Sequence, residues 1–304
     1  MATPNSLEKA IWLKLMGMGC VPWAILGNVF YVDGVNGNDG WDGLTPDTPF
    51  LTITHALTQC VADHDDYIIV LEHWQEVVAI NITRVHIIAI PSNPNHSFVQ
   101  MNAALDTAIF TVSALSNNCE IAGFSFGGGA THAGIENPGG TPMGLYIHSC
   151  QFGHAFAGDT PQDGIRIDAN ATAIRIEHCF LFGDSGKGTL SRDGIRFAAA
   201  ANSYGGAIVN NRFQGITGIS INIVSHGEDL VINGNKFSVP DLANGEAITL
   251  AAATVDGVLV DDNAAMNGNA QVGYGFNPYR DLNAPNNHWG RNYRGNTVIE
   301  PVIA

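Results

Sequence analysis

One short phrase recurs between Ile121 and Val298, and it constrains the fold more than any other feature of the chain. Each copy generally begins with an aliphatic residue. A small polar or sulfur-bearing side chain generally stands three positions later, and an apolar residue stands five positions later. The copies are IAGFSF, IHSCQF, IEHCFL, IVNNRF, INGNKF, VDDNAA and a looser YRGNTV, starting at Ile121, Ile147, Ile176, Ile208, Ile232, Val260 and Tyr293. Their starts lie 26, 29, 32, 24, 28 and 33 residues apart. Such a period predicts a solenoid of stacked coils joined by loops of unequal length.

A second strand-like motif precedes several copies of the phrase. It reads GIRI, GIRF, GISI and AITL, starting at Gly164, Gly194, Gly218 and Ala247. Alternate apolar residues of this motif would fill the interior, whereas Arg166 and Arg196 would point outward. Stacked arginines repel one another unless carboxylates lie between them, and Asp168 and Asp193 are close in sequence. We therefore expect two strands that can be aligned in each coil.

The position three residues into each phrase is expected to form an internal ladder. It holds Phe124, Cys150, Cys179, Asn211, Asn235, Asn263 and Asn296 in successive copies. Asparagines at stacked bends bond to one another and to turn backbone, and cysteine is a small filler for the same slot. The buried structural ladder is predicted to comprise Cys150, Cys179, Asn211, Asn235 and Asn263. His148 and His178 lie near the cysteines, but strand alternation puts them on the opposite face, which argues against a Cys–His catalytic pair.

Charge and cysteine content narrow the class of partner. The formal net charge of −15 argues against a nucleic-acid partner, and it disfavours an anionic polysaccharide held mainly by basic side chains. The five cysteines are widely spread without a C-x-x-C pair, so neither a disulfide framework nor a zinc site is indicated. Pro4, Glu8 and Lys9 interrupt the apolar N-terminus, so we expect neither a signal peptide nor a membrane anchor.

The stretch from Asp33 to Leu57 resembles the N-terminal signature of right-handed parallel β-helix proteins of the pectate-lyase-like superfamily. In that signature a Gly/Asn/Asp loop precedes a Pro-Phe-x-Thr-Ile-x-x-Ala-Leu helix, which here runs from Pro49 to Leu57. The resemblance implies an all-β fold, a right-handed single-stranded parallel β-helix over residues 29–272. A short helical N-terminal arm or cap (1–28) and an irregular C-terminal cap or subunit-contact segment (273–304) would flank it. Because the superfamily includes lyases, hydrolases and structural virus proteins, the resemblance leaves the activity open.

No set of residues matches a catalytic constellation, and an enzymatic role is disfavoured without being settled. Asp261–Asp262 with His226–Gly227 resembles the Asp-Asp pair and Gly-His-Gly turn of polygalacturonases, but the order is reversed and the companion signatures are absent. A groove of acids across adjacent coils is the other candidate, although the solvated faces of an acidic protein would produce the same pattern. Its members would be Asp163, Asp168, Glu177, Asp184 and Asp193. We assign no catalytic residue, metal ligand or cofactor.

The loop after the first strand offers oxygen atoms that suit calcium. They belong to Asp33, Asn36, Asn38, Asp39 and Asp42. The spacing lacks the glycine that a D-x-[DN]-x-[DN]-G loop requires. A glycine-rich turn is therefore the favoured interpretation, and calcium is the alternative.

Both ends of the chain have two interpretations. The apolar pattern from Ser6 to Met16 predicts a short helix, and this arm either caps the solenoid or docks on a partner. The docking residues would be Leu7, Ile11, Trp12, Leu15 and Trp23. The aromatic residues of the C-terminal segment either anchor a subunit contact or close the last coil. They are Phe276, Tyr279, Trp289 and Tyr293.

These observations favour a structural virion protein, made in a host cytoplasm. The specific hypothesis is a bacteriophage capsid decoration (cement) or spike protein that docks on the major capsid protein or another virion protein. A homotrimer is implied by the resemblance. The alternative is a polysaccharide-cleaving tailspike-type hydrolase or lyase, or a glycan-binding adhesin, with host glycans as partners. An adhesin needs exposed aromatic residues in a row, and Tyr146 and Tyr204 are the nearest candidates.

Overall fold

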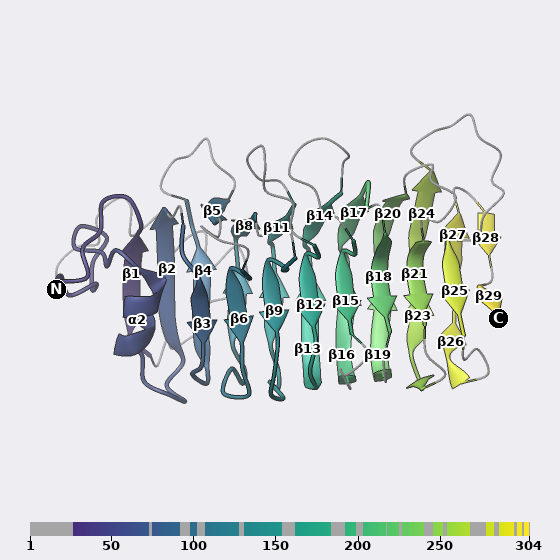
Figure 1. Cartoon of the computed structure of the whole chain (residues 1–304), viewed down its shortest axis with the longest axis horizontal. Coiled ribbons are helices and arrows are strands. Elements are labelled where there is room, and N and C mark those ends of the chain that lie inside the picture. The colour runs from purple at the N-terminus through teal and green to yellow at the C-terminus, as the bar shows by residue number, and fades with distance from the viewer. Residues whose placement is uncertain are drawn as a thin grey trace.

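The protein is an elongated parallel β-solenoid in which successive coils stack along one axis, with the two ends of the chain at opposite ends of the rod (Figure 1). The computed structural model describes residues 27–72, 75–91, 98–101, 107–127, 131–153, 162–183, 192–198, 203–216, 218–224, 227–239, 246–251, 254–267, 278–282, 286–294, 297–299 and 301–303. The predicted fold class, an all-β right-handed parallel β-helix, is confirmed. The predicted helical arm lies outside the described residues.

Three sheets run the length of the solenoid, and each takes one strand from each coil. Sheet 1 contains β1 (Val29–Asp33), β2 (Asp66–Glu72), β4 (Val85–Ala89), β7 (Glu120–Ala122), β10 (Tyr146–His148), β13 (Ala171–Glu177), β16 (Ser203–Val209), β19 (Gly227–Asn233), β23 (Leu259–Asp261) and β26 (His288–Trp289), with β22 (Val255–Asp256) beside β19. Sheet 2 contains β5 (Val99–Met101), β8 (Phe124–Phe126), β11 (Gln151–Phe152), β14 (Phe180–Phe182), β17 (Arg212–Gln214), β20 (Lys236–Val239), β24 (Ala264–Asn267), β27 (Asn292–Arg294) and β28 (Thr297–Ile299). Sheet 3 contains β3 (Val78–Ile80), β6 (Phe110–Val112), β9 (Ile135–Asn137), β12 (Ile165–Ile167), β15 (Ile195–Phe197), β18 (Ile219–Ile223), β21 (Glu246–Leu250), β25 (Tyr279–Asp281) and β29 (Val302–Ile303).

The recurring phrase is a bend between two strands, and the expectation of two strands for each coil was wrong. Its first residue lies on sheet 1 and its last on sheet 2, while the GIRI-type motif forms sheet 3. The residue two positions into each of the first six copies has a positive φ, between 52° and 80°. These residues are Gly123, Ser149, His178, Asn210, Gly234 and Asp262. A left-handed residue turns the chain sharply, so this position sets the corner.

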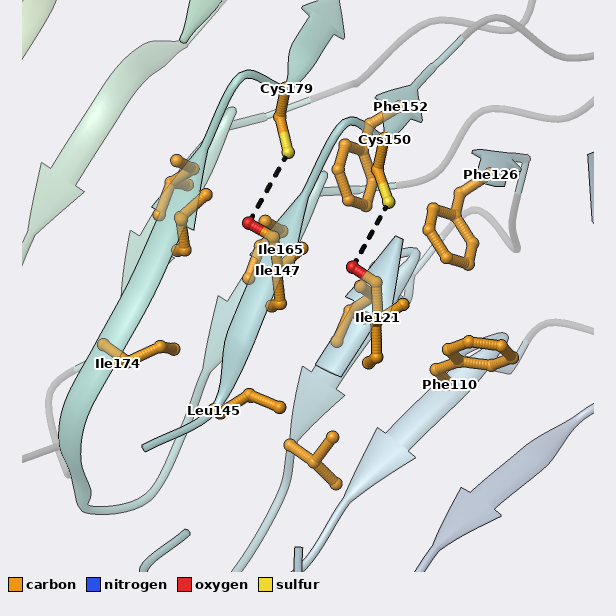
Figure 2. Close-up of a cluster of buried hydrophobic side chains, with 14 of the residues drawn as sticks. Phe110, Ile121, Phe126, Leu145, Ile147, Cys150, Phe152, Ile165, Ile174 and Cys179 are labelled. Carbon is orange, nitrogen blue, oxygen red and sulfur yellow. Dashed lines mark hydrogen bonds between the residues drawn. The ribbon is translucent and has the colours of Figure 1, made fainter. Parts of the chain in front are cut away.

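The interior is filled by the alternate residues that the pattern predicted. Ile147 and Ile176 are register partners on sheet 1, and both are fully buried. Phenylalanines stack along the inner face of sheet 2, with ring centroids of Phe126 and Phe152 5.0 Å apart (Figure 2). Burying a side chain of this size stabilises the fold by about 1.5–3 kcal/mol. The period-two alternation therefore fixes which face of every strand is available to solvent or ligand.

Helix α2 (Ile53–Gln59) closes the N-terminal end, where the signature motif placed a helix. The Thr52 hydroxyl caps it by accepting from the His55 N–H at 3.0 Å. The Glu76 carboxylate accepts from the Ile53 and Thr54 N–H groups at 3.0 and 2.8 Å. Ile53, Ala56 and Leu57 face the core and are buried, so the helix covers the first coil.

The solenoid continues past residue 272, where the sequence pattern had placed its end. Strands β25, β26 and β27 pair in parallel with the preceding coil, and only β28 turns back to pair antiparallel with β27. Tyr279 is fully buried, and its hydroxyl donates to the carbonyl oxygens of Asn263 and Tyr293 at 3.1 and 3.0 Å. The aromatic residues Tyr279 and Trp289 thus close the last coil, whereas Phe276 lies outside the described residues.

Candidate functional site

The ladder residues lie at the bend between sheets 1 and 2, buried and bonded from coil to coil. The Asn211 side-chain amide donates to Asn235 Oδ1 at 3.1 Å, and the Asn235 amide donates to Asn263 Oδ1 at 3.0 Å. Each Oδ1 also accepts the backbone N–H of the asparagine one coil earlier, at 2.9 Å for Asn211 and 3.0 Å for Asn235. Cys179 joins the same column, because its backbone N–H donates to Asn211 Oδ1 at 2.9 Å. The column is a structural device that satisfies backbone groups at the corner.

The final rung of the ladder is Asn292. The Asn263 amide donates to Asn292 Oδ1 at 3.0 Å, whereas Asn296 lies outside the described residues. Tyr293, which opened the loosest copy of the phrase, instead pairs with Ala264 on sheet 2. The Asn-Thr-Val letters suggested a copy that starts at Tyr293, but the residue in register with Val260 is Trp289, four residues earlier.

The cysteines in the ladder are buried thiols directed at backbone carbonyls. Cys150 Sγ lies 3.8 Å from the Ile121 oxygen, and Cys179 Sγ lies 4.0 Å from the Ile147 oxygen (Figure 2). Burial raises the pKa of the Cys179 thiol well above its ordinary value. His148 projects from the outer face, away from Cys150, and bonds to Glu120. No Cys–His pair forms at these positions.

The acids that the sequence offered as a groove are held separately by arginines. Asp163 and Asp193 are almost fully buried and pair with Arg192 and Arg196. Asp168 Oδ2 lies 2.8 Å from Arg166 Nε, and Glu136 lies 3.0 Å from the same guanidinium. Arg166 and Arg196 are register partners, and each of them is paired with a carboxylate. Glu177 lies on sheet 1 beside Arg175, and Asp184 is outside the described residues.

The Asp261–Asp262 pair is split between a strand and a bend. Asp261 ends β23, and its Oδ1 accepts the Arg291 N–H at 2.7 Å. Asp262 is the bend residue, with φ at 52°. His226 lies outside the described residues. The structure therefore gives this pair structural contacts at a corner.

The Asp33–Asp42 loop folds as a turn whose carboxylates bind backbone. Asp33 Oδ1 accepts the Val35 and Asn36 N–H groups, both at 2.9 Å. Asp39 accepts from the Leu51 and Thr52 N–H groups at 2.9 and 3.0 Å. Within the described residues, no three His, Cys, Asp or Glu side chains are grouped so that they could hold a metal ion.

A charged network lies on the outer face of sheet 1, and the sequence analysis did not bring its residues together. Glu120 lies between two histidines from neighbouring coils, with Oε2 2.6 Å from His86 Nδ1 and Oε1 2.7 Å from His148 Nε2. His86 stacks on Tyr67 at 4.4 Å, and His148 stacks on Tyr146 at 4.2 Å. The network thus runs across several coils and is braced by aromatic rings.

The second half of this network centres on Glu177. The Tyr146 hydroxyl donates to Glu177 Oε1, and Arg175 Nε donates to Oε2 at 2.8 Å. The guanidinium of Arg175 also lies over the Tyr146 ring, 5.7 Å from its centroid. Burial opposes the negative charge, but these bonds outweigh it and lower the pKa of Glu177.

Glu120 is ionised at neutral pH. Burial raises the pKa of this carboxyl, but the bonds from His148 and His86 outweigh that effect and lower its pKa to about 2. The site therefore holds two carboxylates, two imidazoles, a phenol and a guanidinium on the face of one sheet. Groups of these kinds can exchange protons or balance the charge of an anion, but both carboxyls are bases rather than proton donors at neutral pH.

The sequence contains a signal for this network. The outward positions on sheet 1 flank the first residue of each phrase, and they hold Glu120 before Ile121, Tyr146 and His148 around Ile147, and Arg175 and Glu177 around Ile176. Aligning these flanking positions from coil to coil would have brought these five charged and aromatic residues together. The predicted docking residues Leu7, Ile11, Trp12, Leu15 and Trp23 lie outside the described residues. No helix in the described part of the chain is long and apolar enough to cross a membrane.

The overall architecture is similar to that of solved β-helix enzymes. The chain matches a GH136 lacto-N-biosidase from Eubacterium ramulus with a TM-score of 0.50 and 14% sequence identity, covering 97% of this chain and 70% of that chain. Pectate lyase Pel9A matches with a TM-score of 0.44 and 14% identity, covering 91% of this chain and 77% of that chain. The sequence matches no protein-family model and no curated protein. At such identity the likeness establishes the fold alone.

Proposed function

We propose that this chain is a structural protein of a virus particle, a decoration or spike protein that works as a rigid scaffold. The observation that carries the proposal is the pairing of its acids: Asp163, Asp168, Glu177 and Asp193 each bond to an arginine. A glycosidase needs one carboxyl that stays protonated near the working pH. The carboxyls of the sheet 1 network, with lowered pKa values, do not supply that proton donor.

The ladder and the stacked core support a mechanical role. Bonds between Asn211, Asn235 and Asn263 join successive coils at one corner, and the apolar interior is continuous along the rod. Such a rod resists bending and presents the same faces along its length. The resemblance of the Asp33–Leu57 segment to β-helix proteins, several of them viral, supports the choice of a virion as the setting.

The proposal is tested by binding to particles. Labelled full-length chain and a variant lacking residues 1–26 are mixed with capsids of the encoding virus and sedimented. Full-length chain should cosediment, and the truncated chain should remain in the supernatant while keeping the β-sheet circular dichroism of the full chain. Failure of the full-length chain to cosediment would contradict docking. A trimeric mass in analytical ultracentrifugation would support the proposed homotrimer, and a monomeric mass would contradict it.

Polysaccharide cleavage is the second candidate, supported by the fold shared with a lacto-N-biosidase. The decisive assay incubates the full chain with host surface glycans and measures new reducing ends. Activity that is lost in Glu120→Gln and Glu177→Gln but kept in Asp261→Asn would replace the structural proposal. The structural proposal predicts no release of product.

A further inference from the structure

A long groove lies on the outer face of sheet 2, and one of its lining residues, His178, lies 3.9 Å from Glu177 of the sheet 1 network. Its volume is about 1030 Å³, and its lining comes from four successive coils. It contains His178, Asn210, Arg212, Lys236, Ser238 and Met266, among others. Because adjacent strands are about 4.8 Å apart, four coils give the groove a length of about 14 Å along the solenoid axis. This is space for an extended ligand rather than for a single ion.

Among the described residues, two cations in this groove have no carboxylate partner, whereas most of the other arginines have one. Arg84, Arg166, Arg175, Arg192, Arg196 and Arg280 all lie within 4.0 Å of a carboxylate oxygen. Arg212 and Lys236 are exposed register partners on β17 and β20, and no described carboxylate lies within ion-pair distance of either. In a chain with 28 acidic and 13 basic residues, two adjacent cations without acids form a local positive site.

The guanidinium of Arg212 is held in place by an aromatic ring. Its Cζ lies 5.2 Å from the Phe180 centroid, on the preceding strand of sheet 2. Stacking uses the flat face of the guanidinium and leaves its N–H edge free to bind a carboxylate with two parallel bonds. Lys236, about 4.8 Å further along the axis, provides a second positive charge for the same or the next carboxylate.

The direction of the groove selects the kind of chain that fits. A peptide lying along the solenoid axis would cross strands whose backbone groups are already paired within sheet 2, so its own N–H and C=O groups would gain no ladder partners. An oligosaccharide has no such requirement. Its hydroxyl groups can both donate to and accept from the Asn210 amide, the Ser238 hydroxyl and the His178 imidazole.

We propose that this groove binds a carboxylate-bearing oligosaccharide, with Arg212 and Lys236 contacting its carboxylates. The net charge of −15 opposes a long acidic polymer but does not prevent a short one from binding here. Screening limits the repulsion from distant acids to about 8 Å at physiological salt. The site goes beyond the structural role, since a decoration protein, a spike or an unrelated scaffold could each use it.

The test measures binding of three short acidic oligosaccharides, containing galacturonate, mannuronate or sialate, to the full chain by calorimetry. Each is paired with its carboxyl-reduced counterpart, which keeps the hydroxyl groups and loses the charge. Arg212→Gln and Lys236→Gln are compared with Arg280→Gln, which removes the same charge from sheet 3. A tetraglutamate peptide provides the competing ligand class.

The expected result is binding of at least one acidic sugar, at least tenfold weaker for its carboxyl-reduced form and for Arg212→Gln and Lys236→Gln, and unchanged for Arg280→Gln. Tenfold corresponds to 1.4 kcal/mol. Affinity should also fall as sodium chloride is raised. Equal binding of the reduced sugar, equal or tighter binding of the peptide, or no binding of any acidic sugar would overturn the proposal. Because no capsid is involved, these results are independent of the docking experiment.

Discussion

Replacing the ladder residue Asn235 by alanine should destabilise the solenoid more than replacing any single asparagine that lies outside the ladder. The side chain is fully buried, and it makes four hydrogen bonds with three neighbours. Its Oδ1 accepts from the Asn211 backbone and side-chain amides at 2.9 and 3.1 Å, and its Nδ2 donates to the Ile208 oxygen at 2.8 Å. The variant therefore removes the bonds that this corner offers to two buried backbone groups.

The magnitude follows from those two groups. Each buried polar group left without a partner costs roughly 1–3 kcal/mol, so the variant should lose about 4 kcal/mol in free energy of unfolding. With an unfolding entropy of about 2.1 cal/mol/K per residue, this loss lowers the melting temperature of a chain of this size by about 6 °C. Two bonds to Asn263 and Asn211 side chains add coupling between coils.

The assay is thermal and urea unfolding followed by circular dichroism. Asn233→Ala is the matched control, because Asn233 is half-buried on the outer face of the same turn of chain, two residues earlier. Its loss should change the free energy of unfolding by no more than about 0.5 kcal/mol. If Asn235→Ala and Asn233→Ala melt within 1–2 °C of each other, a difference of only about 1 kcal/mol in a chain of this size, the ladder does not stabilise the fold as argued.

Three further predictions concern charge and thiols. Because the pKa of Glu120 in the folded protein is lowered to about 2, this carboxylate should contribute about 3 kcal/mol to the free energy of unfolding above pH 5, and the contribution should be lost as the pH falls towards 2. Glu120→Gln should therefore flatten the dependence of the urea midpoint on pH between pH 5 and 2, and an unchanged slope would refute this reasoning. Arg192→Ala should cost about 3–5 kcal/mol because it leaves the fully buried Asp163 without its cation, and Arg192→Met with Asp163→Asn should recover part of the loss in the same unfolding assay. Cys179, whose pKa burial raises, should resist iodoacetamide in the native state and react after unfolding, as read by mass spectrometry; rapid native labelling would contradict its place in the ladder.

The interior of the solenoid could be predicted from the sequence because it repeats. Ile121, Ile147 and Ile176 recur with an apolar requirement that every coil shares, and the ladder position follows from their spacing. The third sheet was not predicted because each phrase contains a bend residue in the left-handed conformation, which divides the phrase between two strands. This position holds glycine, serine, histidine, asparagine or aspartate in different copies. Conformation rather than residue type repeats at that position, so inspection of side-chain chemistry does not reveal it.

The outer faces could not be predicted in the same way. The Glu120–His148 pair and the Arg212–Phe180 contact involve residues 28 and 32 positions apart in the sequence, and they lie in or beside copies of the phrase. Aligning the copies places the outward side chains of each coil beside those of the next. The residue types at these outward positions do not repeat, so the alignment does not show which of them bond to one another.

The three faces differ in whether their charged side chains are paired, and this difference indicates where the protein binds other molecules. On sheet 3, Arg166 and Arg196 are paired with acids of their own coils, and on sheet 1 Glu120 and Glu177 bond to histidines, a tyrosine and an arginine. Stacking identical coils would otherwise place like charges about 4.8 Å apart at every rung, so a solenoid must cancel them to be stable. Arg212 and Lys236 are like charges on adjacent rungs, and no carboxylate of the described residues pairs with either. The repulsion between neighbouring like charges, which pairing with acids avoids on sheet 3, is tolerated at Arg212 and Lys236. The proposed acidic ligand accounts for this, because its carboxylates would pair with the two cations.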